Sequence, residues 1–137
     1  MDDVANLDLA YAPPYSTALD SVIHAANVIR NKLDGAVASI SPTELQERVR
    51  AGEPVLVVDV REPAEVEKSP IEGVDVLTVP LGDIRKRTAE IPQDKDLVCV
   101  CAVGLRGYEA SKALAGAGFS RAFFLDGGLR VWEVLND

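Results

Sequence analysis

Apolar residues between positions 37 and 137 fall into short runs that alternate with helical patterns. Four runs predict buried strands: Val55–Val60, Val76–Val79, Leu97–Cys101 and Ala122–Leu125. The segments between them predict helices, namely Pro42–Arg50, Asp83–Glu90, Tyr108–Ala117 and a last helix that carries Trp132. Strands that alternate with helices imply a mostly parallel sheet covered on both faces, so the pattern predicts a three-layer α/β sandwich.

The first of these helices has the clearest local start signal. Ser41 suits the N-cap, Pro42 suits the first helical position, and Glu44 would close a capping box. The helix should run to about Arg50 and stop at Gly52.

A separate helical pattern precedes residue 37. Apolar residues recur there on one helix face: Val22, Ala26, Ile29 and Leu33. Gly35 is a natural stop. We therefore divide the chain into an N-terminal helical segment, residues 1–36, and an α/β domain, residues 37–137. The apolar face has no evident partner in its own segment, so we expect it to pack on the following domain or on a domain that this chain does not contain.

The charge balance excludes several kinds of partner. The chain has 14 Lys and Arg residues against 22 Asp and Glu residues, a net charge of −8, and no basic stripe. A nucleic-acid backbone or an anionic membrane surface would be repelled. No apolar stretch approaches the roughly 20 residues that span a bilayer, and the N-terminus lacks a signal-peptide pattern. We expect a cytoplasmic protein that binds neither nucleic acid nor membrane.

The cysteine content argues against a structural metal site. Cys99 and Cys101 are the two cysteines, and the one histidine, His24, lies far from them in sequence. These are too few ligands for a structural zinc site, so we expect no metal and a structural role for His24. Two cysteines two positions apart on a strand are poorly placed to bridge each other, which favours free thiols in a reducing compartment.

Cys101 ends a predicted strand and is followed by a short loop with two glycines and then a helix. Reactive groups in parallel α/β sheets lie at the carboxyl ends of strands. Gly104 and Gly107 permit positive φ, so the N–H groups of the loop can curl around the sulfur. The helix that begins near Gly107 and the charge of Arg106 add to the same field. These effects favour the thiolate, and the loop therefore predicts a nucleophile activated by electrostatics instead of a general base.

Both cysteines also have a purely structural interpretation. A lone cysteine at a strand end is more often a packing residue, but the glycines and Arg106 beyond Cys101 favour reactivity. Cys99 points to the same side as Cys101 if the strand is regular. We expect Cys99 to pack in the core, with a resolving thiol as the alternative.

Three motifs, in this order along the chain, resemble those of the rhodanese family. The stretch Val57–Glu62, followed by Glu65, resembles the first core strand and a D-x-R-x-x-x-E signature. The stretch Cys101–Gly107 is similar to the active-site loop of the family, and Leu125–Leu129 with Trp132 resembles its C-terminal G-G…W motif. Together they cover about residues 38–137. The resemblance implies a rhodanese-like three-layer sandwich with a central, mostly parallel sheet, and sulfurtransferase activity.

The same resemblance implies roles for individual residues. Cys101 would be the nucleophile that takes up sulfane sulfur as a persulfide, and Arg106 would orient an anionic donor. The remaining loop residues would cradle the persulfide and bind substrate: Ala102, Val103, Gly104, Leu105 and Gly107. Asp59 and Arg61 would brace the loop from the neighbouring strand, although a purely structural hydrogen-bonding role for Asp59 is the alternative.

Ala102 departs from the pattern of thiosulfate-optimised members, many of which carry a basic side chain at this position. Arg106 is then the only charged residue between Cys101 and Gly107. Thiosulfate is therefore the less expected donor, and a persulfide on a small thiol, or a polysulfide, is easier to accept.

The segment from Leu9 to Ser16, with Asp20 and the helix to Leu33, resembles the end of certain flavin-dependent pyridine nucleotide–disulfide oxidoreductases. In their coenzyme A-disulfide and persulfide reductase branch, such a segment closes the dimerisation domain and a rhodanese domain can follow. The match covers about residues 7–34. It implies that Tyr11 or Tyr15 could lie near the disulfide site of a partner subunit, although a structural role is expected for both.

This second resemblance also implies a flavoprotein disulfide reductase as a partner. FAD and NAD(P)H, or coenzyme A, would belong to that reductase. We expect no cofactor in this chain, because no G-x-G-x-x-G follows a predicted strand.

Two alternatives to a sulfurtransferase remain. A cysteine phosphatase or arsenate reductase could use the same scaffold, but phosphatase relatives have one more loop residue than the six from Cys101 to Arg106. A non-catalytic docking or regulatory module is the other alternative, although such modules commonly lack the cysteine.

Overall fold

The computed structural model describes residues 3, 6, 21–35 and 37–136. The chain forms two compact units, residues 1–37 and 38–137. In the first unit, α2 (Ser21–Leu33) confirms the predicted N-terminal helix. Within its predicted apolar stripe, Ala26 is buried, whereas three large side chains are exposed: Val22, Ile29 and Leu33. None of the described helices is long and apolar enough to cross a membrane.

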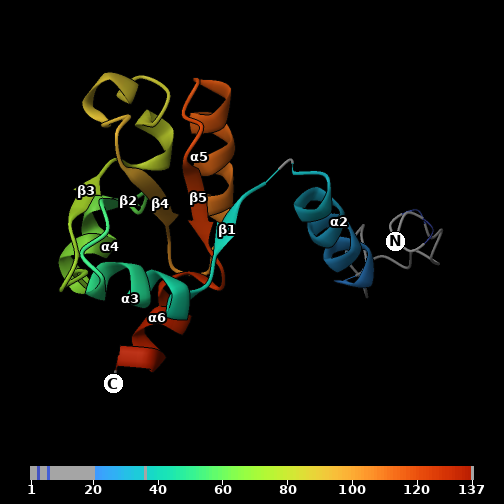
Figure 1. Cartoon of the computed structure of the whole chain (residues 1–137), viewed down its shortest axis with the longest axis horizontal. Coiled ribbons are helices and arrows are strands. Elements are labelled where there is room, and N and C mark those ends of the chain that lie inside the picture. Colours follow the sequence, from blue (N-terminus) through green and yellow to red (C-terminus); the bar gives the residue numbers. More distant parts are fainter. Residues whose placement is uncertain (1–2, 4–5, 7–20, 36, 137) are drawn as a thin grey trace. The chain divides into compact units, whose positions relative to one another are not determined.

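A five-stranded sheet forms the centre of the second unit (Figure 1). Its strands follow the order β1-β5-β4-β2-β3, and all neighbouring strands are parallel. The strands are β1 (Ser39–Ile40), β2 (Val55–Asp59), β3 (Val76–Thr78), β4 (Asp96–Val100) and β5 (Ala122–Leu125). The four predicted strands and the parallel sheet are confirmed. The sequence pattern does not reveal β1, because two residues are too few to form an apolar run.

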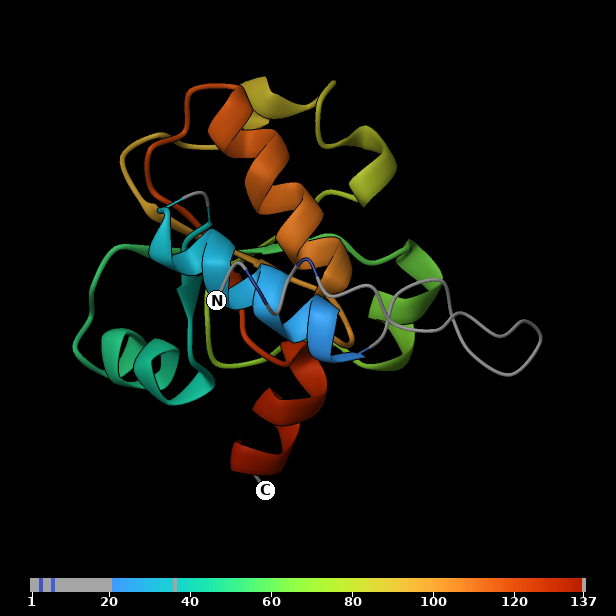
Figure 2. The ribbon, with the colours of Figure 1, turned by 90° about the vertical axis from the view of Figure 1, so that its right-hand side faces the viewer.

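Alternation along β4 divides the core into two layers. Cys99 faces the side covered by α5 (Leu105–Gly116) and by the segment that holds the 3₁₀ helices η1 (Leu81–Asp83) and η2 (Thr88–Glu90). Figure 2 shows α5 beside this segment. Two other helices cover the opposite side of the sheet, which completes the predicted three-layer arrangement.

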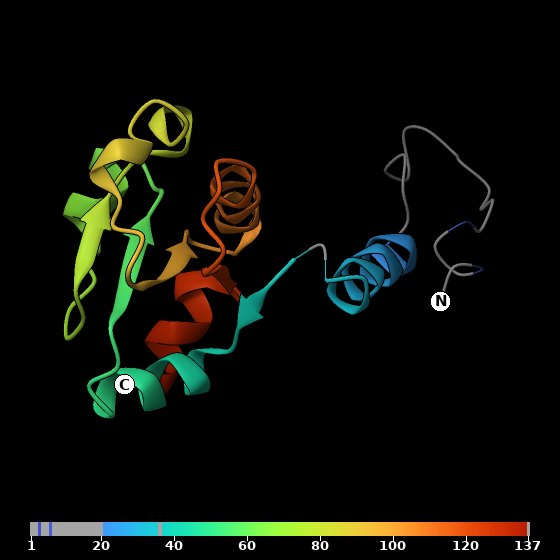
Figure 3. The same cartoon turned by 45° about the horizontal axis from the view of Figure 1, so that its top comes forward.

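On that opposite side, Val98 and Val100 pack with Leu45 of α3 (Pro42–Arg50) and Leu129 of α6 (Gly128–Asn136). These two helices lie side by side (Figures 1 and 3).

The start of α3 agrees with the sequence prediction in part. Ser41 is the N-cap, its Oγ accepts from the N–H of Glu44 at 3.1 Å, and a proline occupies the first turn. The carboxylate of Glu44, which we expected to complete a capping box, instead pairs with Arg48 at 2.5 Å. The helix end at Arg50 is confirmed, and Gly52 follows with a φ of +72°.

Two short segments differ from the prediction. The single helix expected over Asp83–Glu90 is wrong: the chain forms the separate turns η1 and η2, because Gly82, Asp83 and Thr88 are weak helix formers. The structure also contains α4 (Pro63–Lys68), which the sequence pattern does not predict. None of the six residues of α4 is buried, so the helix has no apolar periodicity to detect.

Candidate active site

Cys101 lies directly after β4, at the carboxyl edge of the sheet. The residue is only 1% exposed, and its Sγ accepts a hydrogen bond of 3.2 Å from the N–H of Gly104. Gly104 has a φ of +99° and caps α5, which begins at the next residue. The positive end of a 12-residue helix therefore points at the sulfur, together with a backbone N–H group.

The start of α6 holds this loop in place from the other side. The N–H of Leu129 donates to the carbonyl of Cys101 at 2.9 Å, and the N–H of Arg130 donates to the carbonyl of Ala102 at 3.1 Å. These bonds use N–H groups that a helix start otherwise leaves without partners. They also turn two loop carbonyls toward α6.

Close packing at Gly128 explains why the C-terminal motif contains this glycine. Its φ is +64°, and a Cβ atom there would lie between 2.5 and 2.8 Å from three backbone atoms of the loop. Any side chain at this position would push the loop away from α6.

Gly107 has a different role from the one predicted for it. It is not among the glycines with positive φ, and it lies inside α5, which begins at Leu105 and not near residue 107. A Cβ at Gly107 would lie 2.7 Å from the carbonyl oxygen of Cys99. The glycine therefore allows α5 to approach β4 closely. The helix itself starts three residues before Tyr108, the residue at which we predicted its start.

Arg106 makes a two-pronged ion pair with Glu65 of α4. Its Nη1 donates to Oε2 of Glu65, and its Nη2 donates to Oε1, both at 2.7 Å. This partner holds the pKa of the Glu65 carboxyl at about 2 and raises the pKa of Arg106. Cys101 adds a smaller contribution to the raised pKa of Arg106. The positive charge predicted for the loop is therefore present, but a carboxylate balances it.

Asp59 and Arg61 form a buried ion pair at the end of β2. Nε of Arg61 donates to Oδ1 of Asp59 at 3.0 Å, and Nη2 donates to Oδ2 at 2.7 Å. The same Nη2 donates to the carbonyl of Ser69, the residue that ends α4. The pair therefore anchors α4. Because α4 carries Glu65, the partner of Arg106, the pair supports the cysteine loop indirectly through that helix.

The surroundings of Cys99 support the packing role that we expected. Its side chain is fully buried, and burial raises the pKa of the Cys99 thiol to about 12. The thiol is therefore protonated at neutral pH, which argues against a resolving role. Both cysteines are free, as expected.

Two apolar side chains of the cysteine loop are exposed. Val103 is 55% exposed and Leu105 is 66% exposed, whereas Gly104 between them and Gly107 after them are buried. Val103 and Leu105 therefore add apolar surface to the loop that follows Cys101.

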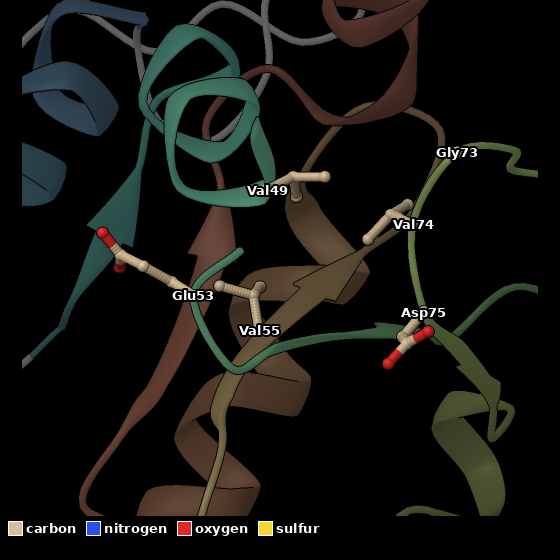
Figure 4. A pocket seen from close by; sticks show the side chains of 6 residues that line it. All are labelled: Val49, Glu53, Val55, Gly73, Val74 and Asp75. Atoms are coloured by element: carbon tan, nitrogen blue, oxygen red, sulfur yellow. The ribbon is translucent and has the colours of Figure 1, made fainter. Parts of the chain in front are cut away.

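A pocket of about 370 Å³ lies at the opposite, amino edge of the sheet (Figure 4). Val49, Val55 and Val74 line it, with Glu53, Gly73 and Asp75 at its rim. The side chain of Glu53 extends away from the valines, and Asp75 accepts a hydrogen bond from Lys95. Because the pocket contains neither a nucleophile nor a cation, we place the chemistry at Cys101.

Some sequence predictions cannot be placed on this site. Tyr11 and Tyr15 lie outside the described residues, and the side chain of His24 is likewise not described. Within the described part of the chain, no group of three His, Cys, Asp or Glu side chains could hold a metal ion.

Two contributions to the site do not follow from the sequence reasoning. Glu65 appears in the D-x-R-x-x-x-E pattern, but the pattern does not show that it binds Arg106. The double glycine identifies residue 128 as part of a motif, but it does not show that this residue contacts the cysteine loop. In both cases the motif is visible and its contact depends on the folded structure.

The fold and the loop together define a parallel α/β domain with a cysteine whose sulfur accepts a backbone N–H at the start of a helix. The chain belongs to the rhodanese-like family: the sequence pattern of the rhodanese-like domain matches residues 41–134. A protein named sulfurtransferase from Allochromatium vinosum is 38% identical over 96 residues, which cover 70% of this chain and 88% of that protein.

Two solved structures match beyond the domain. A NAD-dependent persulfide reductase from A. fulgidus is 46% identical with a TM-score of 0.78, and reduced CoADR-RHD from Bacillus anthracis is 36% identical with a TM-score of 0.83. The matches cover 96% and 95% of this chain, so they reach into the N-terminal segment. The chain spans 22% of the length of each of these two proteins. The resemblance to rhodanese domains of the reductase-linked type is therefore confirmed.

Proposed function

We propose that this domain transfers sulfane sulfur through a persulfide on Cys101. The observation that carries the proposal is the Gly104 N–H bonded to the buried Sγ at the start of α5. A sulfur anion bound there meets a backbone donor and a helix N-terminus. The family and the relative named sulfurtransferase support the same reaction class.

The transfer has two steps. The Cys101 thiolate attacks the outer sulfur of a persulfide R–S–SH, the S–S bond breaks, and R–S⁻ leaves, so that the enzyme carries Cys–S–SH. An acceptor thiolate then attacks the outer sulfur and takes it away, which regenerates the Cys101 thiolate. No net oxidation or reduction occurs, and Cys99 is not needed in either step.

We further propose that the donor is a persulfide on an organic thiol, or a polysulfide, in preference to thiosulfate. Ala102 adds no positive charge to the loop, and Glu65 balances the charge of Arg106. The exposed Val103 and Leu105 can contact the organic part of such a donor. A small dianion would find little to bind.

The acceptor in this proposal is a thiol or a cysteine of a flavoprotein disulfide or persulfide reductase, which would bring its own FAD and NAD(P)H or coenzyme A. The matches to two longer proteins, one of them a persulfide reductase, support this partner. If the proposal holds, adding this chain to a persulfide reductase that lacks its own rhodanese domain will accelerate persulfide-dependent NADH oxidation. The Cys101→Ser chain should give no acceleration.

The transfer itself is tested by steady-state formation of thiocyanate from glutathione persulfide and cyanide. We expect Cys101→Ser to lower the rate about 1000-fold or more, to the background level, because it removes the nucleophile. Cys99→Ala serves as the matched control, since it removes a thiol from the same strand, and it should retain most activity. Absence of thiocyanate with the wild-type chain would instead support a non-catalytic docking module.

A further inference from the structure

Glu65 is held more firmly than an ordinary surface carboxylate. Its Oε1 accepts from Arg106, and its Oε2 accepts both from Arg106 at 2.7 Å and from the N–H of Glu62 at 3.0 Å. The helix that carries it is fixed at its end by the bond from Arg61 to the carbonyl of Ser69. The position of the guanidinium of Arg106 therefore follows from the position of α4.

This ion pair is too exposed to serve mainly as a source of stability. The side chains of Arg106 and Glu65 are 33% and 40% exposed, and pairs of this kind contribute little to the free energy of unfolding. Its geometry nevertheless has a consequence for the site, because Glu65 accepts one N–H from each of the two terminal nitrogens of the guanidinium. The sulfur of Cys101 itself accepts the N–H of Gly104, two residues before Arg106 in the same loop.

The two-pronged end of an arginine is the group that best recognises oxyanions such as sulfonates and phosphates. Here that end is already filled by a carboxylate. An oxyanion that used the same two N–H groups would have to displace Glu65, whereas a sulfur anion on Cys101 meets the N–H of Gly104, which this pair does not involve.

We propose that Glu65 is a positioning and specificity-determining residue, which fixes Arg106 within the loop that follows Cys101 and occupies the end-on pair of N–H groups that an oxyanion donor would otherwise use. The proposal rests on the sulfur transfer proposed above and adds the residue that selects the donor. Glu65 does not touch the reacting atoms, and it acts through Arg106.

The test compares two donors in the Glu65→Gln variant. The ratio of kcat/KM for glutathione persulfide to kcat/KM for thiosulfate is measured with cyanide as the acceptor. Loss of the charge weakens the ion pair and makes the end-on N–H groups of Arg106 available to thiosulfate. We expect the ratio to fall about 10-fold or more, which corresponds to one charge-assisted interaction.

Glu67→Gln is the matched control, because it removes the same charge from an exposed position on the same helix. Its donor ratio should equal that of the wild-type chain. Thermal unfolding verifies that each variant is folded, and Glu65→Ala provides a second variant of different shape should Glu65→Gln fail this check.

The outcomes separate this inference from the proposed function. If the wild-type chain turns over persulfide but Glu65→Gln changes both donors equally, Glu65 has a structural role and the inference is overturned. If the wild-type chain transfers sulfur from neither donor, the proposed function itself fails. A fall in the ratio that is absent in Glu67→Gln supports the inference.

Discussion

Cys99 and Cys101 carry the same side chain two positions apart, on the same side of the sheet, yet their surroundings differ. Cys99 lies within β4, where its backbone belongs to the sheet and its thiol is surrounded by core residues. Cys101 lies just past the strand, where the N–H of Gly104 reaches its sulfur. Both residues are almost completely buried, so burial alone does not distinguish them.

The difference teaches that a reactive cysteine depends on the backbone beyond the strand. In a regular strand the backbone N–H groups donate to the neighbouring strands, so none of them is directed at a side chain. The turn at Gly104 frees N–H groups, and the start of α6 fixes the loop by binding two of its carbonyls. The difference between Cys99 and Cys101 therefore depends on how firmly the loop after Cys101 is held. The substitutions described next test that dependence.

The largest effect is expected from breaking the buried pair that anchors α4. Asp59→Asn leaves Arg61 buried without its counter-charge, and we expect a loss of about 3–4 kcal/mol in the free energy of unfolding. Urea unfolding measures it. Asp75→Asn removes one partner of the exposed pair with Lys95 and should cause no measurable change. Equal effects of the two substitutions would contradict the account.

Gly128→Ala should have the next largest effect, about 3 kcal/mol, and should also reduce sulfur transfer. The new Cβ would clash with the backbone of the loop, and a φ of +64° is unfavourable for alanine. Gly116→Ala is the matched control, because a Cβ there meets no atom within 4 Å and the residue is in α5. We expect it to leave stability unchanged or slightly higher. Normal activity in folded Gly128→Ala would show that the contact with α6 is not needed.

Cys99 gives a smaller, pH-dependent effect. Its pKa is about 12 in the folded chain against an ordinary value of 9.0, so above pH 9 the unfolded chain loses this proton first. Stability from this group is complete below pH 9 and declines as the pH rises toward 12, with a slope that approaches about 1.4 kcal/mol per pH unit.

Urea unfolding between pH 8 and pH 11 compares the wild-type chain with Cys99→Val. The difference in stability between the two should change with pH by this slope, because other titrating groups are shared. A constant difference would mean that Cys99 ionises in the folded state as readily as in the unfolded one.

The regular part of the fold can be predicted because its signals are local. The apolar runs of β2, β4 and β5 and the Ser41–Pro42 helix start depend on neighbouring residues. By contrast, β1 has only two residues, and α4 has a proline and a capping box at its start but buries no residue that would give it an apolar pattern. Both elements form because tertiary contacts support them.

The candidate site is likewise divided into residues that local sequence signals identify and contacts that only the folded structure shows. Cys101 and Gly104 can be identified from the strand–loop–helix pattern. The close approach of Gly107 to Cys99, and the pairing of Arg106 with a carboxylate 41 positions away, depend on how the helices pack. Gly107 therefore looks like a loop residue in the sequence and proves to be a packing residue in the helix.

The most direct test of the central claim is the intact mass of the reduced chain after brief exposure to glutathione persulfide. The account predicts a gain of one sulfur, about 32 Da, on the wild-type and Cys99→Ala chains and none on Cys101→Ser, and the gain should disappear on adding cyanide. A gain that persists in Cys101→Ser, or no gain on the wild-type chain, would contradict the claim that Cys101 carries the sulfur.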